Sequence, residues 1–439
     1  MGNRAAALVL AILLLPACEG GGGGGGGGLP GGNGALRARN VVLIVADDLG
    51  YADLGAHGSP QALTPHIDSI ASAGVRCTNG YVSGPYCSPT RAGLLTGRYQ
   101  QRFGHEFNTA GPGTGLPVTE VTLADRMRAA GVATGAIGKW HLGTDAPFRP
   151  LRRGFDEYYG ILGGASTYCN ATVFRNATSF AETRYLTEAI GEEAVDFIER
   201  RKSAPFFLYL TFNAVHTPMD VPPQKYMDRF PHLPSGTRKT YLAMLAAMDD
   251  AVGAVLSKLR AEGLEDDTLV AFISDNGGPV ESGTSINGAI NTPLRSGKRT
   301  LWEGGIRVPY FVKWPARLPS GTVYEPPVIQ LDLFTTALAA VGGSPPPGVL
   351  IDGVDLAPFL DGTATGAPHD RLYWRFGSPS AVRQGNWKLF KNGTNPSQLY
   401  DLAADIGETT DVAAAHPAVV AQLEADLAAW KSELVAPLW

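Results

Sequence analysis

Residues 41–48 decide the fold, and they read VVLIVADD. Six apolar residues in a row, most of them β-branched, predict a strand that is buried on both of its faces. Two aspartates, Asp47 and Asp48, follow at the point where this strand ends. Strands of this kind are typical of a mainly parallel sheet covered by helices on both sides. The stretch therefore predicts an α/β fold with acidic side chains at one edge of the sheet.

Other runs of the same kind alternate with helical patterns along the chain. Strands are expected at residues 132–138, 206–212, 268–274 and 308–312. Helices are expected at residues 65–74, 126–130, 187–201, 239–262 and 330–341. Thr64 is expected to cap the first of these helices, and Thr122 with Asp125 to form a capping pair at the second. The alternation predicts one large, mainly parallel sheet flanked by helices on both faces.

Polar side chains follow four of the expected strands. They are Asp47, Asp48, Lys139, His141, His216, Asp275 and Asn276. In open parallel sheets, ligands bind in the crevice beyond the carboxyl ends of the strands. We therefore expect these side chains to converge on a single site.

Two pairs of adjacent residues in this set offer only oxygen atoms as metal ligands. They are Asp47 with Asp48 and Asp275 with Asn276. Such a set suits a hard cation, Ca²⁺ or Mg²⁺, and disfavours Zn²⁺, which prefers nitrogen and sulfur. A single pair of this type usually serves turn or capping chemistry. Two pairs at two strand ends favour a metal site instead.

Composition limits the classes of function. The chain has 439 residues, of which 44% are hydrophobic and 18% charged, as in a soluble globular protein with a large core. Its formal net charge of −5 gives no reason to expect a nucleic-acid partner.

The amino-terminal segment is typical of an exported protein. Residues 1–17 combine Arg4 with a short apolar stretch, which predicts a signal peptide too short to span a bilayer. The sequence LPAC, ending at Cys18, is similar to a bacterial lipobox, and an ordinary signal peptide with an incidental cysteine is the alternative. The glycine-rich residues 18–37 are expected to form a flexible tether. We expect a protein of the bacterial periplasm or cell surface, attached to the membrane only by a lipid at Cys18.

The remaining chain is expected to form a main domain over residues 38–366 and a smaller α+β subdomain over residues 367–439. The subdomain contains expected strands at residues 372–375 and 387–390, an extended segment at 399–401 and a final helix at 417–434. Four cysteines are few for an exported chain of this length. Cys77 and Cys169 either pair with each other or remain free thiols.

The run Cys87-Ser88-Pro89-Thr90-Arg91 suits the first turn of a helix that ends before Gly97. Cys87 would then lie at a helix N-terminus, where backbone N–H groups favour an anion. Taken alone, a buried structural cysteine is the more common role.

This run resembles the maturation and active-site signature of type I sulfatases, members of the alkaline phosphatase superfamily. Residues 135–143, GAIGKWHLG, and residues 302–309, WEGGIRVP, also match that family. The resemblance implies an alkaline-phosphatase-like fold. It further implies that Cys87 is oxidised to formylglycine by a formylglycine-generating or sulfatase-maturating enzyme.

The resemblance assigns roles to the other candidates. Arg91 and Lys139 would hold the aldehyde hydrate, and His141 would remove a proton from its second hydroxyl. His216 and Lys298 would contact the sulfate and protonate the leaving alcohol. The two acidic pairs would hold a divalent cation, Ca²⁺ or Mg²⁺, against the sulfate oxygens.

These features predict a sulfatase that hydrolyses sulfate monoesters, with a sulfated carbohydrate favoured over an aryl sulfate as the substrate. The alternatives are a phosphate or phosphonate ester hydrolase of the same superfamily and a non-catalytic sugar-binding surface lipoprotein. Arg149, Arg152 and Arg153 form a short basic loop. It either meets an anionic polysaccharide or is simply solvated.

Overall fold

The structure is a computed structural model that describes residue 2, residues 37–281 and residues 285–439. Cys18, the signal peptide apart from Gly2, and the tether up to residue 36 lie outside the described residues. Within the described ranges, no helix combines the length and the apolar character that a bilayer crossing requires.

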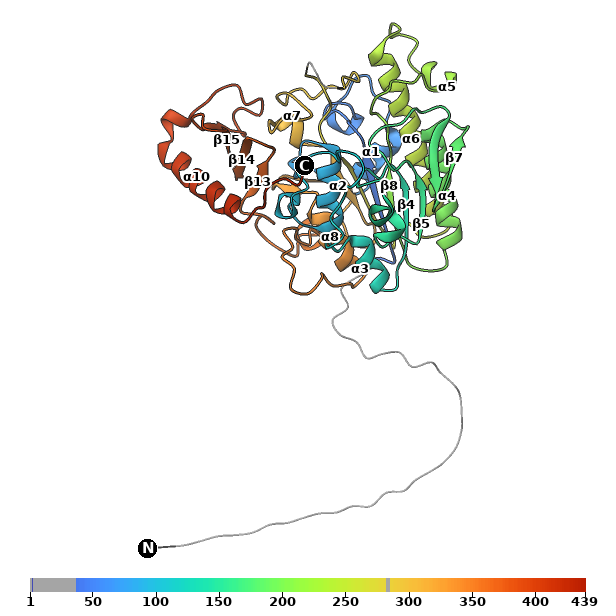
Figure 1. The fold of residues 1–439 in the computed structure, drawn as a ribbon, viewed down its shortest axis with the longest axis horizontal. Helices are drawn as coiled ribbons and strands as arrows, with labels where there is room; N and C mark the ends of the chain where they lie inside the picture. The colour runs from blue at the N-terminus through green and yellow to red at the C-terminus, as the bar shows by residue number, and fades with distance from the viewer. Residues whose placement is uncertain (1, 3–36, 282–284) are drawn as a thin grey trace. The chain divides into compact units, whose positions relative to one another are not determined.

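A mixed sheet of ten strands forms the centre of the described chain, in the order β11-β2-β10-β9-β1-β8-β4-β5-β6-β7 (Figure 1). The strands are β1 (Asn40–Ala46), β2 (Val75–Cys77), β4 (Ala133–Gly138), β5 (Glu157–Gly160), β6 (Ala171–Arg175), β7 (Thr178–Glu182), β8 (Phe206–Thr211), β9 (Thr268–Ser274), β10 (Tyr310–Lys313) and β11 (Thr322–Tyr324). The five central strands, β9-β1-β8-β4-β5, are all parallel. On one side β10 pairs antiparallel with β9, and on the other β6 pairs antiparallel with β5. β7 pairs antiparallel with β6 and so runs in the direction of the central strands. The predicted mainly parallel sheet is confirmed.

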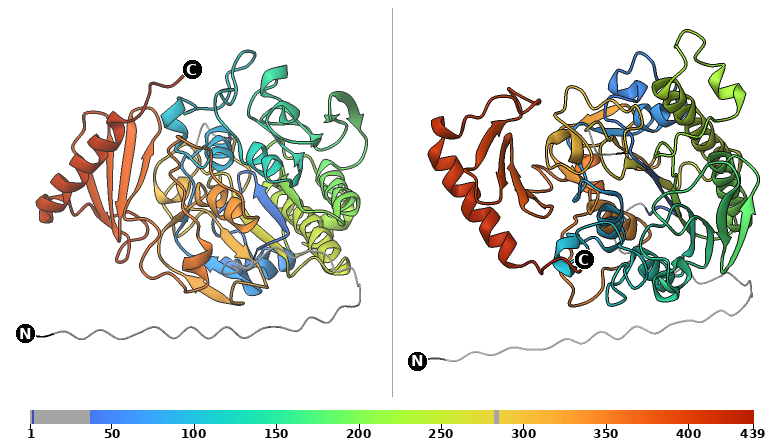
Figure 2. Two further views of the ribbon diagram at one scale, coloured as in Figure 1. Left: turned by 90° about the horizontal axis from the view of Figure 1, so that it is seen from below. Right: turned by 45° about the horizontal axis from the view of Figure 1, so that its top comes forward.

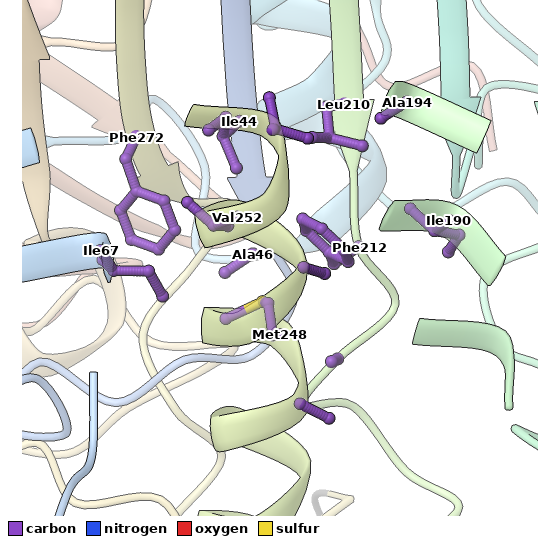
Figure 3. Close-up of a cluster of buried hydrophobic side chains, with 14 of the residues drawn as sticks. Ile44, Ala46, Ile67, Ile190, Ala194, Leu210, Phe212, Met248, Val252 and Phe272 are labelled. Carbon is purple, nitrogen blue, oxygen red and sulfur yellow. The ribbon is translucent and has the colours of Figure 1, made fainter. Parts of the chain in front are cut away.

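Alternate residues of β1 supply the two cores on either side of the sheet. Val42, Ile44 and Ala46 face a core shared with α1 (Pro65–Ser72), α4 (Leu186–Arg201) and α6 (Thr237–Ala261), part of which is drawn in Figure 3. The intervening residues face a core shared with α2 (Cys87–Thr96), α3 (Leu123–Ala129) and α8 (Asp332–Ala340). Each fully buried Val or Ile contributes about 1.5–3 kcal/mol relative to an exposed one. The unbroken apolar run of β1 is therefore stabilised from both sides.

The predicted helix caps have different outcomes. Thr122 and Asp125 form the expected capping pair, although helix α3 begins directly at Leu123. The prediction for Thr64 is wrong in its chemistry, because its hydroxyl accepts a hydrogen bond from the Gly55 N–H and does not cap α1. The first N–H groups of α1 donate instead to Asp249, a residue of α6.

A second sheet follows the main one. It is antiparallel in the order β13 (Leu372–Arg375), β14 (Pro379–Gln384), β15 (Trp387–Asn392) and β16 (Gln398–Asp401). Helix α10 (Pro417–Ser432) packs on β14 and β15 (Figure 2). A third core joins this sheet to the main body through residues that include Tyr81, Trp374 and Trp430. The predicted smaller α+β subdomain is confirmed.

Short elements complete the described fold. A two-stranded parallel sheet pairs β3 (Gly80–Tyr81) with β12 (Val328–Ile329), and the one-turn helices are α5 (Gln224–Met227), α7 (Glu303–Ile306) and α9 (Ala357–Leu360). No disulfide joins the described cysteines. Cys77 is a buried free thiol and Cys169 an exposed one.

Candidate functional site

The carboxyl ends of four adjacent parallel strands bring the predicted polar residues together. Strands β9, β1, β8 and β4 lie side by side in this order. The Asp275 N–H donates to the Ala46 carbonyl at 3.0 Å, and the Lys139 N–H donates to the Thr211 carbonyl at 2.8 Å. The residues just beyond the strands therefore share one edge of the sheet.

Cys87 lies against this edge. It is the first residue of α2, which ends before Gly97 as the sequence predicts, and Gly97 has a left-handed conformation. Its Sγ lies 3.5 Å from Oδ1 of Asp47. The other carboxylate oxygen of Asp47 accepts a hydrogen bond from Lys139 Nζ, and both of these side chains are fully buried. Burial alone raises the pKa of Asp47, but Lys139 and the other nearby cations outweigh it and hold that pKa far below its usual range.

Asp48 is the centre of a second group of contacts. The Nζ of Lys298 lies 2.7 Å from Oδ1 and 2.8 Å from Oδ2 of this carboxylate. The side-chain amide of Asn276 donates to Oδ1 at 2.7 Å. The Nε2 of His216 lies 3.6 Å from Oδ2.

Asp275 joins the two groups. Arg91 donates to its Oδ2 from Nε at 3.0 Å and from Nη2 at 2.7 Å, and donates to the Lys139 carbonyl from Nη1 at 2.9 Å. The Asp48 N–H donates to the other oxygen of Asp275 at 3.3 Å. Burial, helped by the Asp47 carboxylate, raises the pKa of Asp275 to about 6.

The charges in this cluster balance. Three carboxylates face three cationic side chains, and every one of the six is at most 4% exposed: Asp47, Asp48, Asp275, Arg91, Lys139 and Lys298. Buried charges are rare unless they are paired, because the loss of hydration is costly. The cluster is therefore neutral overall, and a bound dication would give it a charge of about +2, suited to a substrate anion.

Sequence comparisons identify the family. Residues 39–343 match the sequence model described as Sulfatase, and residues 296–433 match the one described as N-sulphoglucosamine sulphohydrolase, C-terminal. The chain belongs to the sulfatase family.

Relatives of this sulfatase match over most of their length. It is 36% identical over 390 residues to N-acetylgalactosamine-6-sulfatase of Canis lupus familiaris, covering 82% of this chain and 72% of that protein. It is 34% identical over 462 residues to arylsulfatase A of Homo sapiens, covering 90% and 88%. The crystal structure of Ps i-CgsB in complex with k-i-k-neocarrahexaose matches with a TM-score of 0.86 at 35% identity, covering 92% of this chain and 95% of that chain. The protein is thus a sulfuric ester hydrolase.

The residues of the sulfatase pocket fit a hard cation. Ligand atoms of Asp47, Asp48, Cys87 and His216 all lie within 4.8 Å of one another. The buried Oδ1 of Asn276 has no hydrogen-bond partner in the described residues. The group around Asp47 thus contains two carboxylates, a thiol and an imidazole, and it does not include Asp275. Its two carboxylates and the unused amide oxygen of Asn276 match the ligand preference of Ca²⁺ and Mg²⁺.

His141 adopts a left-handed backbone conformation, with φ of 57°, at the side of the pocket. Its Nδ1 is buried and has no partner among the described residues. Burial, together with the Lys139 and Arg91 cations, holds the pKa of His141 well below its ordinary value. The imidazole is therefore neutral near pH 7 and has one ring nitrogen, Nδ1, without a partner in the described residues.

A cavity of about 340 Å³ gives access to these residues. Its lining consists of Tyr86, Asn108, Thr109, His141, Gly164, Ala165, His216, Ser285, Lys298 and Arg299. All ten predicted site residues therefore lie in the buried cluster or in the cavity wall next to it.

Sequence reasoning missed the residues behind Cys87. The Ser88 hydroxyl donates to the His141 carbonyl at 2.6 Å and lies 2.6 Å from His105 Nε2. The Ser88 N–H donates to Asn108 Oδ1 at 3.0 Å. Adjacency to Cys87 is a signal for Ser88, but no local pattern marks His105 or Asn108.

The three arginines of the predicted basic loop lie in different surroundings. Arg153 is buried and donates to the carbonyls of Leu116 and Glu120, which is a structural role. Arg152 is exposed. Arg149 lines a separate cavity of about 400 Å³ that shares Ala165 with the first.

Proposed function

We propose that this sulfatase hydrolyses sulfate monoesters of a sulfated carbohydrate, with Cys87 converted to formylglycine. The observation that carries the proposal is the contact between Cys87 and the buried, charge-balanced cluster at Asp47, next to an open cavity. The printed names of two similar proteins support a carbohydrate substrate. One is N-acetylgalactosamine-6-sulfatase, and the other was solved in complex with k-i-k-neocarrahexaose. An aryl sulfate ester is the simplest surrogate substrate.

In this proposal Asp47, Asp48, Asp275 and Asn276 hold a divalent cation, Ca²⁺ or Mg²⁺. When bound, such an ion stabilises the negative charge that develops on sulfate oxygens. Arg91 already donates to one oxygen of Asp275, so it fixes the orientation of that carboxylate and opposes the rise of its pKa.

Position 87 supplies the nucleophile. A formylglycine hydrate there carries two hydroxyls on one carbon, one to attack sulfur and one whose deprotonation releases sulfate. Lys139 and Arg91 lie next to this position and orient it through Asp47 and Asp275. His141 is the base, because it is neutral and lines the cavity.

His216 and Lys298 bind the sulfate and serve the leaving group. Both line the cavity, and both approach Asp48 at its inner end. A cationic lysine offers three donors to sulfate oxygens. One of the two gives a proton to the alcohol oxygen as its bond to sulfur breaks.

The test begins with the enzyme coexpressed with a formylglycine-generating enzyme. Mass spectrometry of the peptide that contains Cys87 should show an aldehyde in place of the thiol. The matured enzyme should hydrolyse 4-nitrophenyl sulfate faster than 4-nitrophenyl phosphate. Faster phosphate turnover would favour a phosphate or phosphonate ester hydrolase, and no turnover with retained sugar binding would favour a non-catalytic lipoprotein.

Two substitutions test the roles in the pocket. Cys87→Ala should abolish turnover, and Asp275→Asn should lower kcat at least about a hundred-fold, because charge stabilisation in the pocket is lost. Asp266→Asn, at an exposed position after α6, is the control and should keep wild-type activity. Removal of divalent ions with a chelator should inactivate the enzyme reversibly.

We also propose that the protein is exported to the bacterial periplasm or cell surface and lipid-anchored at Cys18. The amino-terminal sequence supports this. Cys18→Ser should move the protein from the membrane fraction to the soluble fraction. Retention in the membrane fraction would refute the anchor.

A further inference from the structure

Arg299 is an exposed residue in the wall of the cavity that leads to the sulfatase pocket. It directly follows Lys298, and its backbone is in the left-handed region with φ of 71°. Its N–H donates to the Pro85 carbonyl at 2.8 Å, two residues before Cys87. This strained conformation is held by the segment that carries the nucleophile position.

The left-handed turn places two consecutive side chains on the same cavity. In an extended strand, neighbouring side chains point to opposite faces. Here Lys298 and Arg299 both line the cavity, and both lie over the ring of Tyr86, at 5.4 and 5.7 Å from its centroid. Tyr86 is fixed in turn by an edge-on contact with Phe376, at 5.9 Å between ring centroids.

The two cations differ in their partners. Lys298 is buried and paired with Asp48. The guanidinium of Arg299 has no carboxylate within ion-pair distance in residues 37–281 and 285–439, and the cavity lining contains no Asp or Glu. An unpaired guanidinium in a cavity with cationic walls raises the local concentration of anions.

We propose that Arg299 binds a second anionic group of the substrate, a carboxylate or a further sulfate, while Lys298 contacts the sulfate that is cleaved. The inference rests on the proposed sulfatase function and specifies its substrate as a saccharide with at least two negative charges. A guanidinium offers a planar pair of donors that fits either anion. A neutral sugar ring with a single sulfate leaves this residue without a ligand.

The test compares four sulfate esters with the matured enzyme. They are 4-nitrophenyl sulfate, a neutral disaccharide with one sulfate, a disaccharide with two sulfates, and a disaccharide with one sulfate and one carboxylate. The wild type should have its highest kcat/KM on one of the last two, and the better of them identifies the anion. Arg299→Gln should lower kcat/KM on that substrate about ten-fold more than on 4-nitrophenyl sulfate, mainly by raising KM. Arg299→Lys should recover part of the loss.

The control is Arg260→Gln, at an exposed arginine near the end of α6 that pairs with Glu265. It should leave the ratio between the substrates unchanged. The preference of the wild type for the doubly charged ester should also weaken with added salt, more steeply than in Arg299→Gln.

Two results would overturn the inference. One is an Arg299→Gln variant that loses the same factor on singly and doubly charged esters, and the other is a wild type that prefers the singly charged disaccharide. If 4-nitrophenyl sulfate is still hydrolysed in either case, the proposed sulfatase function stands while the role of Arg299 falls. Absence of turnover on all four esters by matured enzyme would overturn both.

Discussion

Asp48 and His141 adopt left-handed backbone conformations, with φ of 59° and 57°. Such conformations cost about 1–2 kcal/mol for residues other than glycine. The cost at Asp48 is offset by its surroundings, because Asn287 donates to its carbonyl and Lys298 pairs with its carboxylate. Left-handed turns directly after strands therefore aim these side chains at the pocket rather than along the sheet.

Gly164 packs directly against the ring of His141 and has no room for a larger side chain. A Cβ at this position would lie 2.4 Å from Nε2 of His141, whereas a Cβ at Gly163 would have nothing closer than 3.9 Å. Gly164→Ala should therefore displace the imidazole and lower kcat on 4-nitrophenyl sulfate about ten-fold or more. Gly163→Ala is the matched control and should remain close to wild type. Equal kcat in the two variants would show that the position of the His141 ring does not limit turnover.

Among the elements, helix α1 shows how a cap can come from a distant part of the chain. The Asp249 side chain accepts from the N–H of His66 at 3.1 Å and of Ile67 at 2.8 Å. Asp249 belongs to α6, which packs against α1. The residue that local sequence favours, Thr64, is engaged by Gly55 and Asp68 instead. The cap thus also ties two helices of one core together.

Removal of this cap should lower stability measurably. Asp249→Ala leaves two N–H groups of α1 without an acceptor and should lower the free energy of unfolding by about 1–2 kcal/mol. Asp250→Ala, at the next residue, removes a partly exposed ion pair with Arg229 and should cost less than about 1 kcal/mol. Thermal unfolding of both variants checks the difference. Similar midpoints for the two would argue against the cap.

The start of helix α8 carries a pH-dependent contact. The Nε2 of His369 lies 2.7 Å from Oδ1 of Asp332, the first residue of α8. Burial alone lowers the pKa of His369, but the Asp332 carboxylate outweighs burial and raises that pKa above its ordinary value of 6.5. A raised pKa in the folded state means that the folded protein holds this proton more tightly than the unfolded chain.

The stability that the His369–Asp332 pair contributes depends on pH. The contribution of the pair is complete below pH 6.5 and is lost as the pH rises through the higher folded-state pKa. The unfolding midpoint of His369→Gln should therefore fall less between pH 6 and pH 9 than that of the wild type. His232→Gln, at an exposed histidine, serves as the control. Parallel pH profiles for His369→Gln and the wild type would contradict the assignment.

For the molecule as a whole, buried ion pairs and a hydrogen bond connect the four-stranded sheet to helix α7 and to the loop before it. Lys388 of β15 is fully buried, with Nζ 2.9 Å from Glu303 and 2.8 Å from Glu408. Glu303 begins helix α7, and its N–H donates to Glu408 at 2.7 Å. Arg295, in the loop that carries Lys298, donates to the Glu408 carbonyl at 2.7 Å. Through these contacts the second sheet holds in place the loop that carries Lys298.

Loss of Lys388 should affect stability and activity together. Lys388→Met leaves Glu408 buried without its cation and leaves Glu303 with Arg307 at 3.4 Å as its remaining ion-pair partner. Breaking a buried pair in this way typically costs about 3–5 kcal/mol. We expect a lower unfolding midpoint and, at temperatures where the variant is folded, a lower kcat/KM on 4-nitrophenyl sulfate. Lys391→Met, on the same strand, breaks only a partly exposed pair with Glu424 and should change neither. Unaltered kinetics in folded Lys388→Met would separate the second sheet from the active site.

The sequence by itself determined the sheet, the helices around it and the convergence of acidic residues on one edge. The hydrophobic period of a strand and the chemistry of a turn are local properties, and parallel strands end at a common edge of the sheet. The residues after four expected strands therefore indicated the fold and the place of the candidate site, and Asp47 with Asp48 alone would not have done so. Only the tertiary structure decided three other features: the cap at Asp249, the contact of His105 with Ser88 behind Cys87, and the position of Arg299 in the cavity wall. Each depends on contacts between residues that are distant in sequence. Such contacts arise from packing and produce no local pattern of hydrophobic or polar residues in the sequence.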